Sequence, residues 1–165
     1  MPTPPATATP APVAAPAGSG LAGYAGYGDL RFGMSEAEAR QAWGGALNGD
    51  APGDGCHYLN PVSARAPSHF ALMFEGGRFV RYDVGNDAEV APGGGKVGMD
   101  AGQVRALYGD RVAESPHKYV DGASYLRVPA ADGDGVLVFE TDAAGRVTAW
   151  HAGVAPQVDY IEGCS

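Results

Sequence analysis

Apolar and polar positions along this chain follow the same pattern twice, in two segments that begin about 65 residues apart. Segments 32–44 and 97–109 each contain, in the same order, Gly-Met, a helix-capping residue, an arginine, an aromatic residue and a closing glycine. The runs that follow are also repeated, so that Phe-Glu stands at 74–75 and again at 139–140. Such repetition predicts a pseudo-symmetric fold built from two copies of one helix-and-strand unit.

Both segments carry the signals of a short helix. The side chain at the cap can accept a hydrogen bond from a free backbone amide, and a Glu or Gln three residues later can reach back to the cap. These pairs are Ser35 with Glu38 and Asp100 with Gln103. Gly44 and Gly109 stand where a glycine commonly ends a helix. The pattern therefore predicts helices over residues 36–43 and 101–108.

Strand-like runs follow each predicted helix, and stretches rich in Gly, Asp and Pro separate them. The expected strands are 56–59, 69–75 and 78–84 in the first repeat and 117–127, 136–141 and 146–152 in the second. The expected loops are 48–55, 85–96 and 129–135. We therefore predict an α+β fold with one antiparallel sheet, covered on one face by the two short helices.

Alternation along the strands assigns side chains to two faces of this sheet. The side chains expected to face the helices are Leu72, Phe74, Phe79, Leu137, Phe139 and Val147. The opposite face mixes aromatic, methionine and arginine side chains, which is typical of an interaction surface. The candidate partner-binding residues are Met73, Arg78, Tyr82, Arg146 and Trp150. The alternative is that they form ordinary cross-strand pairs that shield the sheet.

The N-terminal segment differs in composition from the rest. Residues 1–20 consist almost entirely of Pro, Ala, Thr and Gly, and no charged residue precedes Asp29. A segment this rich in proline buries too little apolar surface to offset the entropy of ordering it. We therefore expect a disordered linker over 1–28 and a single globular domain over 29–165. Within that domain, the two repeats are expected to be 29–92 and 93–165.

The 165-residue chain is acidic, with a formal net charge of -8 at pH 7. This charge argues against nucleic acid as a partner, because phosphates attract basic surfaces, and against binding to anionic membrane surfaces. No apolar run in the sequence is long enough to span a bilayer.

Two cysteines, Cys56 and Cys164, are the only ones in the chain. They are either two buried free thiols or a disulfide that pins the C-terminal end to a strand-like run, and we favour the disulfide. In the chain-entropy account, closing a loop of about 100 residues stabilises the fold by about 4–5 kcal/mol. A disulfide also implies an oxidising compartment.

No motif of nucleophilic or nucleotide chemistry is present. A G-x-S-x-G sequence is absent, and the glycine-rich run 92–96 lacks the flanking residues of a phosphate loop. The Asp-Gly repeat at 132–135 lacks the further ligands of a calcium loop, so a hairpin turn is the simpler interpretation. We therefore predict that the protein is not an enzyme and needs no cofactor.

Histidine and glutamate positions carry weaker signals. The histidines, which form no H-x-x-x-H pair, are His57, His69, His117 and His151, and we expect no metal site. Glu75 and Glu140 are repeat-related and would form a glycosidase-like pair if they converged, but solvated strand-end carboxylates are the simpler interpretation. The segment 115–120 is either a recognition edge or an edge strand protected by Pro116 and Lys118, and we favour the second.

The repeated pattern of Gly-Met, a capped helix ending in an aromatic residue and Gly, and antiparallel strands resembles a known family. It is similar to the tandem repeats of beta-lactamase-inhibitor-like and BamE(SmpA)-like bacterial envelope proteins, over residues 29–165. The stretches 79–86, 91–96 and 158–164 also resemble a small family of bacterial envelope proteins labelled lectins. The first resemblance implies a non-enzymatic protein that binds another protein through its sheet face.

Two hypotheses of function follow. The first is an inhibitor, immunity or assembly protein of the cell envelope that binds a protein partner through the five candidate residues. The second is a carbohydrate-binding module in which Tyr82, Trp150 and His151 stack on sugar rings. A flexible uncharged tether is typical of bacterial lipoproteins, although no signal peptide is recognisable and Met1 is followed directly by Pro2. We therefore expect a location in the periplasm or tethered to the outer membrane.

Overall fold

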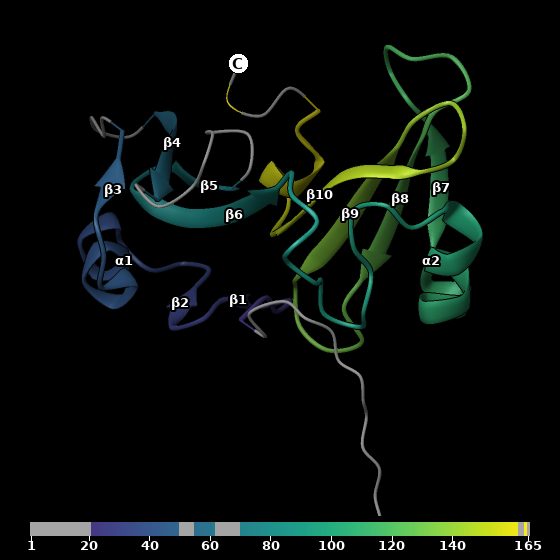
Figure 1. The fold of residues 1–165 in the computed structure, drawn as a ribbon. Coiled ribbons are helices and arrows are strands. Elements are labelled where there is room, and N and C mark those ends of the chain that lie inside the picture. Colours follow the sequence, from purple (N-terminus) through teal and green to yellow (C-terminus); the bar gives the residue numbers. More distant parts are fainter. Residues whose placement is uncertain (1–20, 50–54, 62–69, 162–163, 165) are drawn as a thin grey trace, which may run out of the picture.

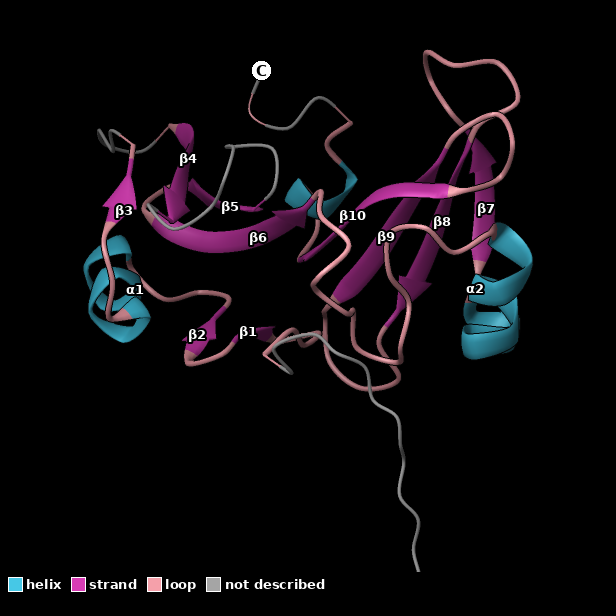
Figure 2. Cartoon of the chain, viewed as in Figure 1, coloured by secondary structure: helices cyan, strands magenta, loops and turns pink. Residues whose placement is uncertain are grey.

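A computed structural model describes residues 21–49, 55–61, 70–161 and 164. The first half contains β1 (Gly26–Tyr27), β2 (Leu30–Arg31), α1 (Glu36–Trp43), β3 (Leu47–Asn48), β4 (Cys56–Pro61), β5 (Phe70–Glu75) and β6 (Arg78–Val84). The second half contains α2 (Ala101–Tyr108), η2 (Gly109–Arg111), β7 (Ala113–Pro116), β8 (Ser124–Pro129), β9 (Val136–Thr141), β10 (Val147–Gly153) and η3 (Gln157–Asp159). The chain is thus an α+β protein made mostly of strands (Figure 2).

The strands form one large antiparallel sheet. Its eight strands lie in the order β3-β4-β5-β6-β10-β9-β8-β7, and β1 pairs with β2 in a separate two-stranded sheet. The two halves of the chain meet where β6 pairs with β10, with Trp150 opposite Val84 and His151 opposite Asp83. Figure 1 shows α1 beside β3 and α2 beside β7, at the two ends of this sheet.

Both helices lie at the residues that the capping pattern predicts. The Ser35 side chain accepts a hydrogen bond from the Glu38 amide, and the Glu38 carboxylate accepts one from the Ser35 amide. Asp100 and Gln103 form the same reciprocal pair at the start of α2. Each box satisfies two amides that a helix start otherwise leaves free, so short local signals were enough to locate these helices.

One register shift in each half changes which side chains face the core. In the β5–β6 pairing the shift falls between Met73 and Phe74 of β5, which leaves Val80 as an extra residue in β6. The β10–β9 pairing is shifted in the same way between Val147 and Ala149. A β-bulge of this kind inverts the alternation of faces beyond it, because two residues of one strand oppose one residue of the other.

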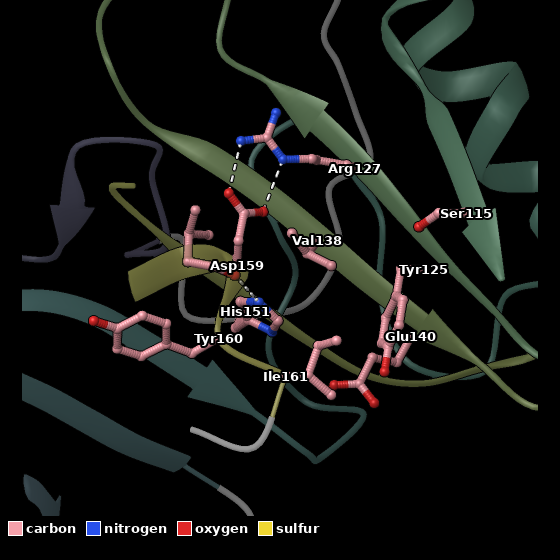
Figure 3. Close-up of a pocket in the computed structure, with 10 residues that line it drawn as sticks. Ser115, Tyr125, Arg127, Val138, Glu140, His151, Asp159, Tyr160 and Ile161 are labelled. Atoms are coloured by element: carbon pink, nitrogen blue, oxygen red, sulfur yellow. Dashed lines mark hydrogen bonds and ion pairs between the residues drawn. The ribbon is translucent and has the colours of Figure 1, made fainter. Parts of the chain in front are cut away.

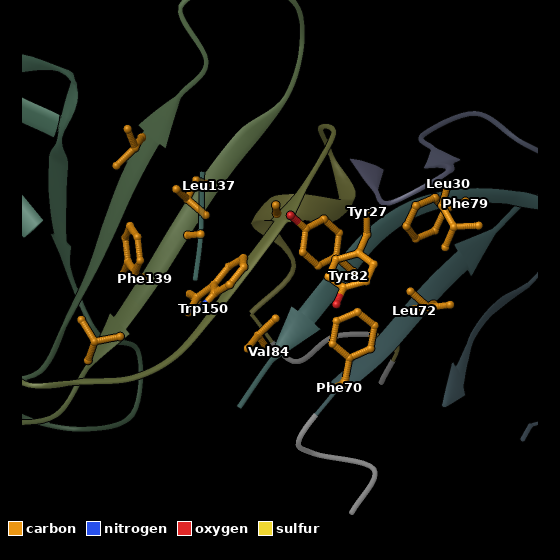
Figure 4. Packing of buried hydrophobic residues seen from close by; sticks show 14 of the residues in the cluster. Tyr27, Leu30, Phe70, Leu72, Phe79, Tyr82, Val84, Leu137, Phe139 and Trp150 are labelled. Atoms are coloured by element: carbon orange, nitrogen blue, oxygen red, sulfur yellow. The ribbon is translucent and has the colours of Figure 1, made fainter. Parts of the chain in front are cut away.

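The bulges place Tyr82 and Trp150 in the core, so the prediction that they face outward is wrong. Tyr82 is 0% and Trp150 1% exposed, on the same face as Phe79 and Val147. The two rings make an edge-to-face contact with centroids 5.8 Å apart, and Figure 4 shows both among the core side chains. Met73 does lie on the opposite face, but it is fully buried as well. None of these three side chains is available to a partner.

A single cluster of buried side chains joins the sheet to both helices and to the N-terminal segment. Ala39 of α1 and Val104 and Tyr108 of α2 belong to it, together with Tyr27 and Leu30 from the small sheet. Tyr27 packs edge-on against the rings of two sheet residues, Phe70 at 4.7 Å and Tyr82 at 5.4 Å. The small sheet is therefore part of the core.

The burial of Tyr27 corrects the predicted domain boundary. We expected a disordered linker up to residue 28, yet residues 21–28 contain strand β1 and contribute to the core. Aromatic residues among the glycines of this stretch, Tyr24 and Tyr27, distinguish it from the proline-rich segment before it. Residues 1–20 lie outside the described part of the chain.

The strand predicted over 117–127 begins too early, and only residues 124–127 of it lie in a strand. Strand β7 ends before it, at Pro116, and strand β8 begins at Ser124. Between them, the His117 Nδ1 atom accepts hydrogen bonds from the amides of Tyr119 and Val120, at 3.0 and 3.1 Å, and so supports a turn. β7 is the last strand in the sheet order, as the edge-strand interpretation of this region requires.

We predict that Trp150→Ala destabilises the fold by about 3–5 kcal/mol, because it removes a fully buried aromatic side chain and leaves a cavity. Val120→Ala, at an exposed apolar position of the turn between β7 and β8, is the control and should change the free energy of unfolding by less than about 0.5 kcal/mol. Urea unfolding of the three proteins measures both values. Equal stability of Trp150→Ala and the parent would contradict the core position of this residue.

Candidate functional site

The face of the sheet opposite the core, here called the outer face, is partly covered by the C-terminal segment 154–161, here called the strap. Val158 of the strap is buried against Val136, Val138 and Tyr125. Asp159 forms an ion pair with Arg127 of β8, with Nε to Oδ1 at 2.9 Å. Figure 3 shows Asp159, Tyr160 and Ile161 of the strap, with dashed lines from Asp159 to Arg127.

A disulfide beyond the end of the strap links the chain to β4. Cys56, the first residue of β4, is bonded to Cys164, as the sequence analysis expected. The Glu75 carboxylate, at the end of β5, accepts hydrogen bonds from the side-chain Nε2 of Gln157 at 3.0 Å and from the Tyr160 hydroxyl at 2.9 Å. The strap is thus held by a covalent bond at its end and by polar contacts along its length.

Arg81 is the main polar anchor of the strap. Its side chain is buried, and Nη1 donates hydrogen bonds to the carbonyl oxygens of Gln157 at 2.9 Å and Tyr160 at 2.8 Å. Nε and Nη2 donate to the two carboxylate oxygens of Asp83 at 2.7 and 2.9 Å. A buried charge is unfavourable unless it is paired and hydrogen-bonded, and this guanidinium meets both conditions.

Asp83 also accepts a hydrogen bond from a tyrosine of strand β4. The Tyr58 hydroxyl donates to Asp83 Oδ2 at 3.2 Å. Burial and the adjacent carboxylate raise the pKa of Tyr58 well above its usual value, so this hydroxyl stays protonated. The Tyr58–Asp83–Arg81 group is therefore a satisfied network that carries no net charge.

His151 is a second buried contact to the strap. Its Nε2 atom lies 2.7 Å from the carbonyl oxygen of Val158, to which it donates. Burial, and then the charge of Arg81, lower the pKa of His151 from 6.5 to about 4. The imidazole is therefore neutral at physiological pH, and its hydrogen bond fixes the proton on Nε2.

Beyond the strap, the outer face is hollowed. The floor of the hollow includes two small side chains, Ala71 and Ala149, and its sides are formed by Tyr58, Asp83 and Glu140. Its volume is about 380 Å³. A second cavity of about 150 Å³ lies under the edge of the strap. Glu140 and His151 line both, so the two spaces meet at these residues.

Glu140 is the distinctive group of this region. It is half-buried, and burial raises the pKa of its carboxyl group above the usual value, although His117 and the charge of Arg81 act in the opposite direction. The Nε2 atom of His117 lies 3.6 Å from Oε1 of Glu140, beyond hydrogen-bond distance. Tyr125 lies directly across from Glu140 on β8, and its hydroxyl has no hydrogen-bond partner among the described residues.

The structure does not bring the five candidate partner-binding residues together as an exposed surface. Tyr82, Trp150 and Met73 are buried. Arg78 and Arg146 are exposed, but they hold the loops before the helices: Arg78 Nη1 donates to the Gly33 carbonyl and Arg146 Nη1 to the Gly98 carbonyl, each at 3.0 Å.

Sequence reasoning did single out Glu140, but for the wrong reason. It was considered as a pair with Glu75, whereas Glu75 holds the strap and Glu140 lines the hollow. Tyr58, Asp83 and Ala149 were not recognised. Tyr58-Leu59 and Tyr125-Leu126 are repeat-related, and this was the available signal that two tyrosines stand at equivalent places on the outer face.

Two further expectations concern metals and membranes. His69 lies outside the described residues, and within the described segments no three His, Cys, Asp or Glu side chains gather as a metal site would require. In the same segments, no helix has the length and apolar character needed to cross a membrane.

Comparisons with known proteins add little. No protein-family model matches this chain, and no curated protein matches it. It is similar to a solved extracellular protein containing an SCP domain from Bacillus anthracis str. Ames, with 12% sequence identity and a TM-score of 0.46. The match covers 74% of this chain and 44% of that chain, so this chain spans less than half of that structure. A likeness at this level carries no inference about family or activity.

We predict that His151 makes the fold less stable in mild acid. The folded-state pKa lies near 4 and the unfolded value near 6.5, so its contribution is fully present above about pH 6.5. The contribution is lost as pH falls towards 4, because only the unfolded chain takes up the proton, and the loss is about 3 kcal/mol at most. His151→Gln keeps a donor near Val158 and removes the titration. Urea unfolding between pH 4 and pH 7 should therefore show a flatter profile for this variant, and identical profiles would refute the assignment.

We also predict that the double variant Cys56→Ser/Cys164→Ser loses about 2–5 kcal/mol of stability, since the bond closes a separation of 108 residues. Amide exchange at Val158, which donates to the Val154 carbonyl, should accelerate more than exchange in β9. Intact-mass measurement of the unreduced parent after alkylation provides the control. Two alkylated thiols there would show that the bond is absent.

Proposed function

We propose that this chain is a non-enzymatic binding protein of the bacterial cell envelope that recognises a protein partner through the open part of its outer sheet face. The observation that carries the proposal is the hollow, which combines a rigid floor of paired strands with a half-buried carboxylate at one side. A preformed site of this kind loses little conformational entropy when a partner binds. An inhibitor, immunity or assembly role each requires such a surface.

The surroundings of the hollow favour a protein as the partner. Ile161 of the strap is 44% exposed and lines the same small cavity as Tyr125. Tyr125 stacks on His117 with ring centroids 4.7 Å apart, and His117 contacts Tyr119, which is 60% exposed. Aromatic and aliphatic side chains therefore lie at and beside the small cavity, which shares Glu140 and His151 with the hollow. Protein interfaces commonly combine exposed aromatic side chains with a few directional polar contacts.

The same proposal includes an architecture of two pseudo-symmetric repeats, 29–92 and 93–165, with both helices on one face. The strand order supports it, because each half contributes four consecutive strands from the sheet edge to the middle. The equivalent hydrogen bonds of Arg78 and Arg146 to the loops before the helices support it as well.

A location in the periplasm or at the outer membrane is part of the proposal. The Cys56–Cys164 disulfide is compatible with an extracellular or envelope location, because such bonds persist in oxidising compartments.

A carbohydrate ligand is the second candidate. The ring of Tyr58 beside the polar side chains of Asp83 and Asn60 favours it, since sugars bind where an apolar ring and planar polar groups converge. The version that relies on Tyr82 and Trp150 stacking on a sugar is excluded by their burial.

The test is site-specific cross-linking in cells. With p-benzoylphenylalanine in place of Ala149, at the floor of the hollow, we expect a covalent adduct with a protein. The same group in place of Ala143, an exposed residue of the β9–β10 turn, should give none. With the partner identified, Ala149→Trp should weaken its binding roughly 30-fold or more by filling the hollow, while Ala143→Trp leaves it unchanged.

Two results would overturn the proposal. One is the absence of a protein adduct at position 149. The other is release of the bound partner by simple sugars, which would favour the carbohydrate-binding alternative.

A further inference from the structure

We infer that the hollow receives a cationic side chain, a lysine or an arginine, and that Glu140 is its counter-ion. The inference rests on the proposed function in one respect only, namely that the cation belongs to a protein partner. It concerns the charge of the site, which follows from the hydrogen bonds of the residues around it.

The buried arginine beside the site, Arg81, already forms hydrogen bonds with other groups. Arg81 directs Nε and Nη2 at Asp83 and Nη1 at two strap carbonyl oxygens, and its side chain is buried. It neutralises Asp83 and cannot turn towards Glu140 without leaving four hydrogen bonds. The other arginine of this face, Arg127, is paired with Asp159. No lysine or arginine of the described segments forms an ion pair with Glu140.

Hydrogen bonds define where the ring protons of the two histidines at the site lie. His117 accepts hydrogen bonds at Nδ1 from the amides of Tyr119 and Val120, so Nδ1 carries no proton and the ring proton is on Nε2, facing Glu140. His151 donates from Nε2 to the strap and stays uncharged because it is fully buried. When Glu140 is ionised, the hollow therefore holds one uncompensated negative charge.

An uncompensated carboxylate in a half-buried position is unfavourable, and an entering cation relieves it. Burial raises the pKa of Glu140, which shows that its environment disfavours the ionised carboxylate even with Arg81 and His117 nearby. The Tyr125 hydroxyl, across from Glu140 and without a partner among the described residues, can accept a second hydrogen bond from an ammonium or guanidinium group. The adjacent tyrosine rings also favour a cation over an anion. Phosphate, sulfate and carboxylate ligands are disfavoured by the same charge.

The experiment uses four small probes. Nα-acetyl-lysine methylamide and Nα-acetyl-arginine methylamide present the cations, and the matched norleucine and citrulline compounds present the same shapes without charge. In two-dimensional NMR titrations of the full chain, we expect saturable shifts at Glu140, Tyr125 and Ala149 with at least one cationic probe. The neutral probes should bind at least tenfold more weakly. Equal shifts with neutral and cationic probes, or none with any probe, would overturn the inference.

Variants then assign the counter-ion. Glu140→Gln should weaken binding of the cationic probe at least tenfold, which corresponds to about 1.4 kcal/mol. Asp110→Asn, at an exposed position in η2, changes the net charge by the same amount and should have no effect beyond about twofold. Lowering the pH should weaken binding in the parent at a pH above the ordinary carboxyl range, because Glu140 takes up a proton there. Equal losses in both variants would indicate non-specific attraction and refute the site.

This outcome is separable from that of the proposed function. Probe binding that depends on Glu140, without a protein adduct at position 149, would support the cation site and overturn the protein partner. A protein adduct at position 149 whose affinity is unchanged by Glu140→Gln would support the partner and overturn the cation site.

Discussion

A single extra residue in each half of the sheet decides what the two faces of this protein are made of. Strict alternation from Phe79 would direct Arg81 into the apolar cluster and Tyr82 to the outside. The bulge at Val80 reverses this, so that the ring enters the core and the guanidinium lies on the outer face. The equivalent shift beside Val147 does the same for the second half. The core and the outer face both depend on these two register shifts.

The outer face is then divided by how its charges are satisfied. On the covered side, Arg81 has Asp83 as a counter-ion and strap carbonyl oxygens as acceptors, and His151 is kept neutral by its burial. On the open side, no lysine or arginine of the described segments forms an ion pair with Glu140, and His117 Nε2 lies 3.6 Å from its Oε1 atom. A saturated network and an unsaturated carboxylate therefore lie side by side on one sheet.

Local signals in the sequence located much of the fold, and non-local ones did not. The capping pairs located both helices because the atoms involved are within one turn of each other. The pairing of Cys56 with Cys164 followed from there being two cysteines. A bulge has no sequence marker of its own, so period-two reasoning assigned Tyr82 and Trp150 to the wrong face. The hollow was not predicted, for two reasons. It is lined by alanines, which carry no functional pattern in a sequence. Its boundary is also set by the strap, which packs on strands far away in sequence.

The position of the strap in the chain has a consequence for how a protease would affect this protein. Every residue of the cluster that joins the sheet to the helices precedes residue 154, whereas the acceptors of Arg81 Nη1 belong to Gln157 and Tyr160. A single cut between the cluster and these acceptors would leave the strap covalently attached to β4 through the Cys56–Cys164 disulfide. After reduction, the same cut would let the strap dissociate and would remove both acceptors of Arg81 Nη1. The redox state of one bond therefore decides whether such a cut uncovers the outer face.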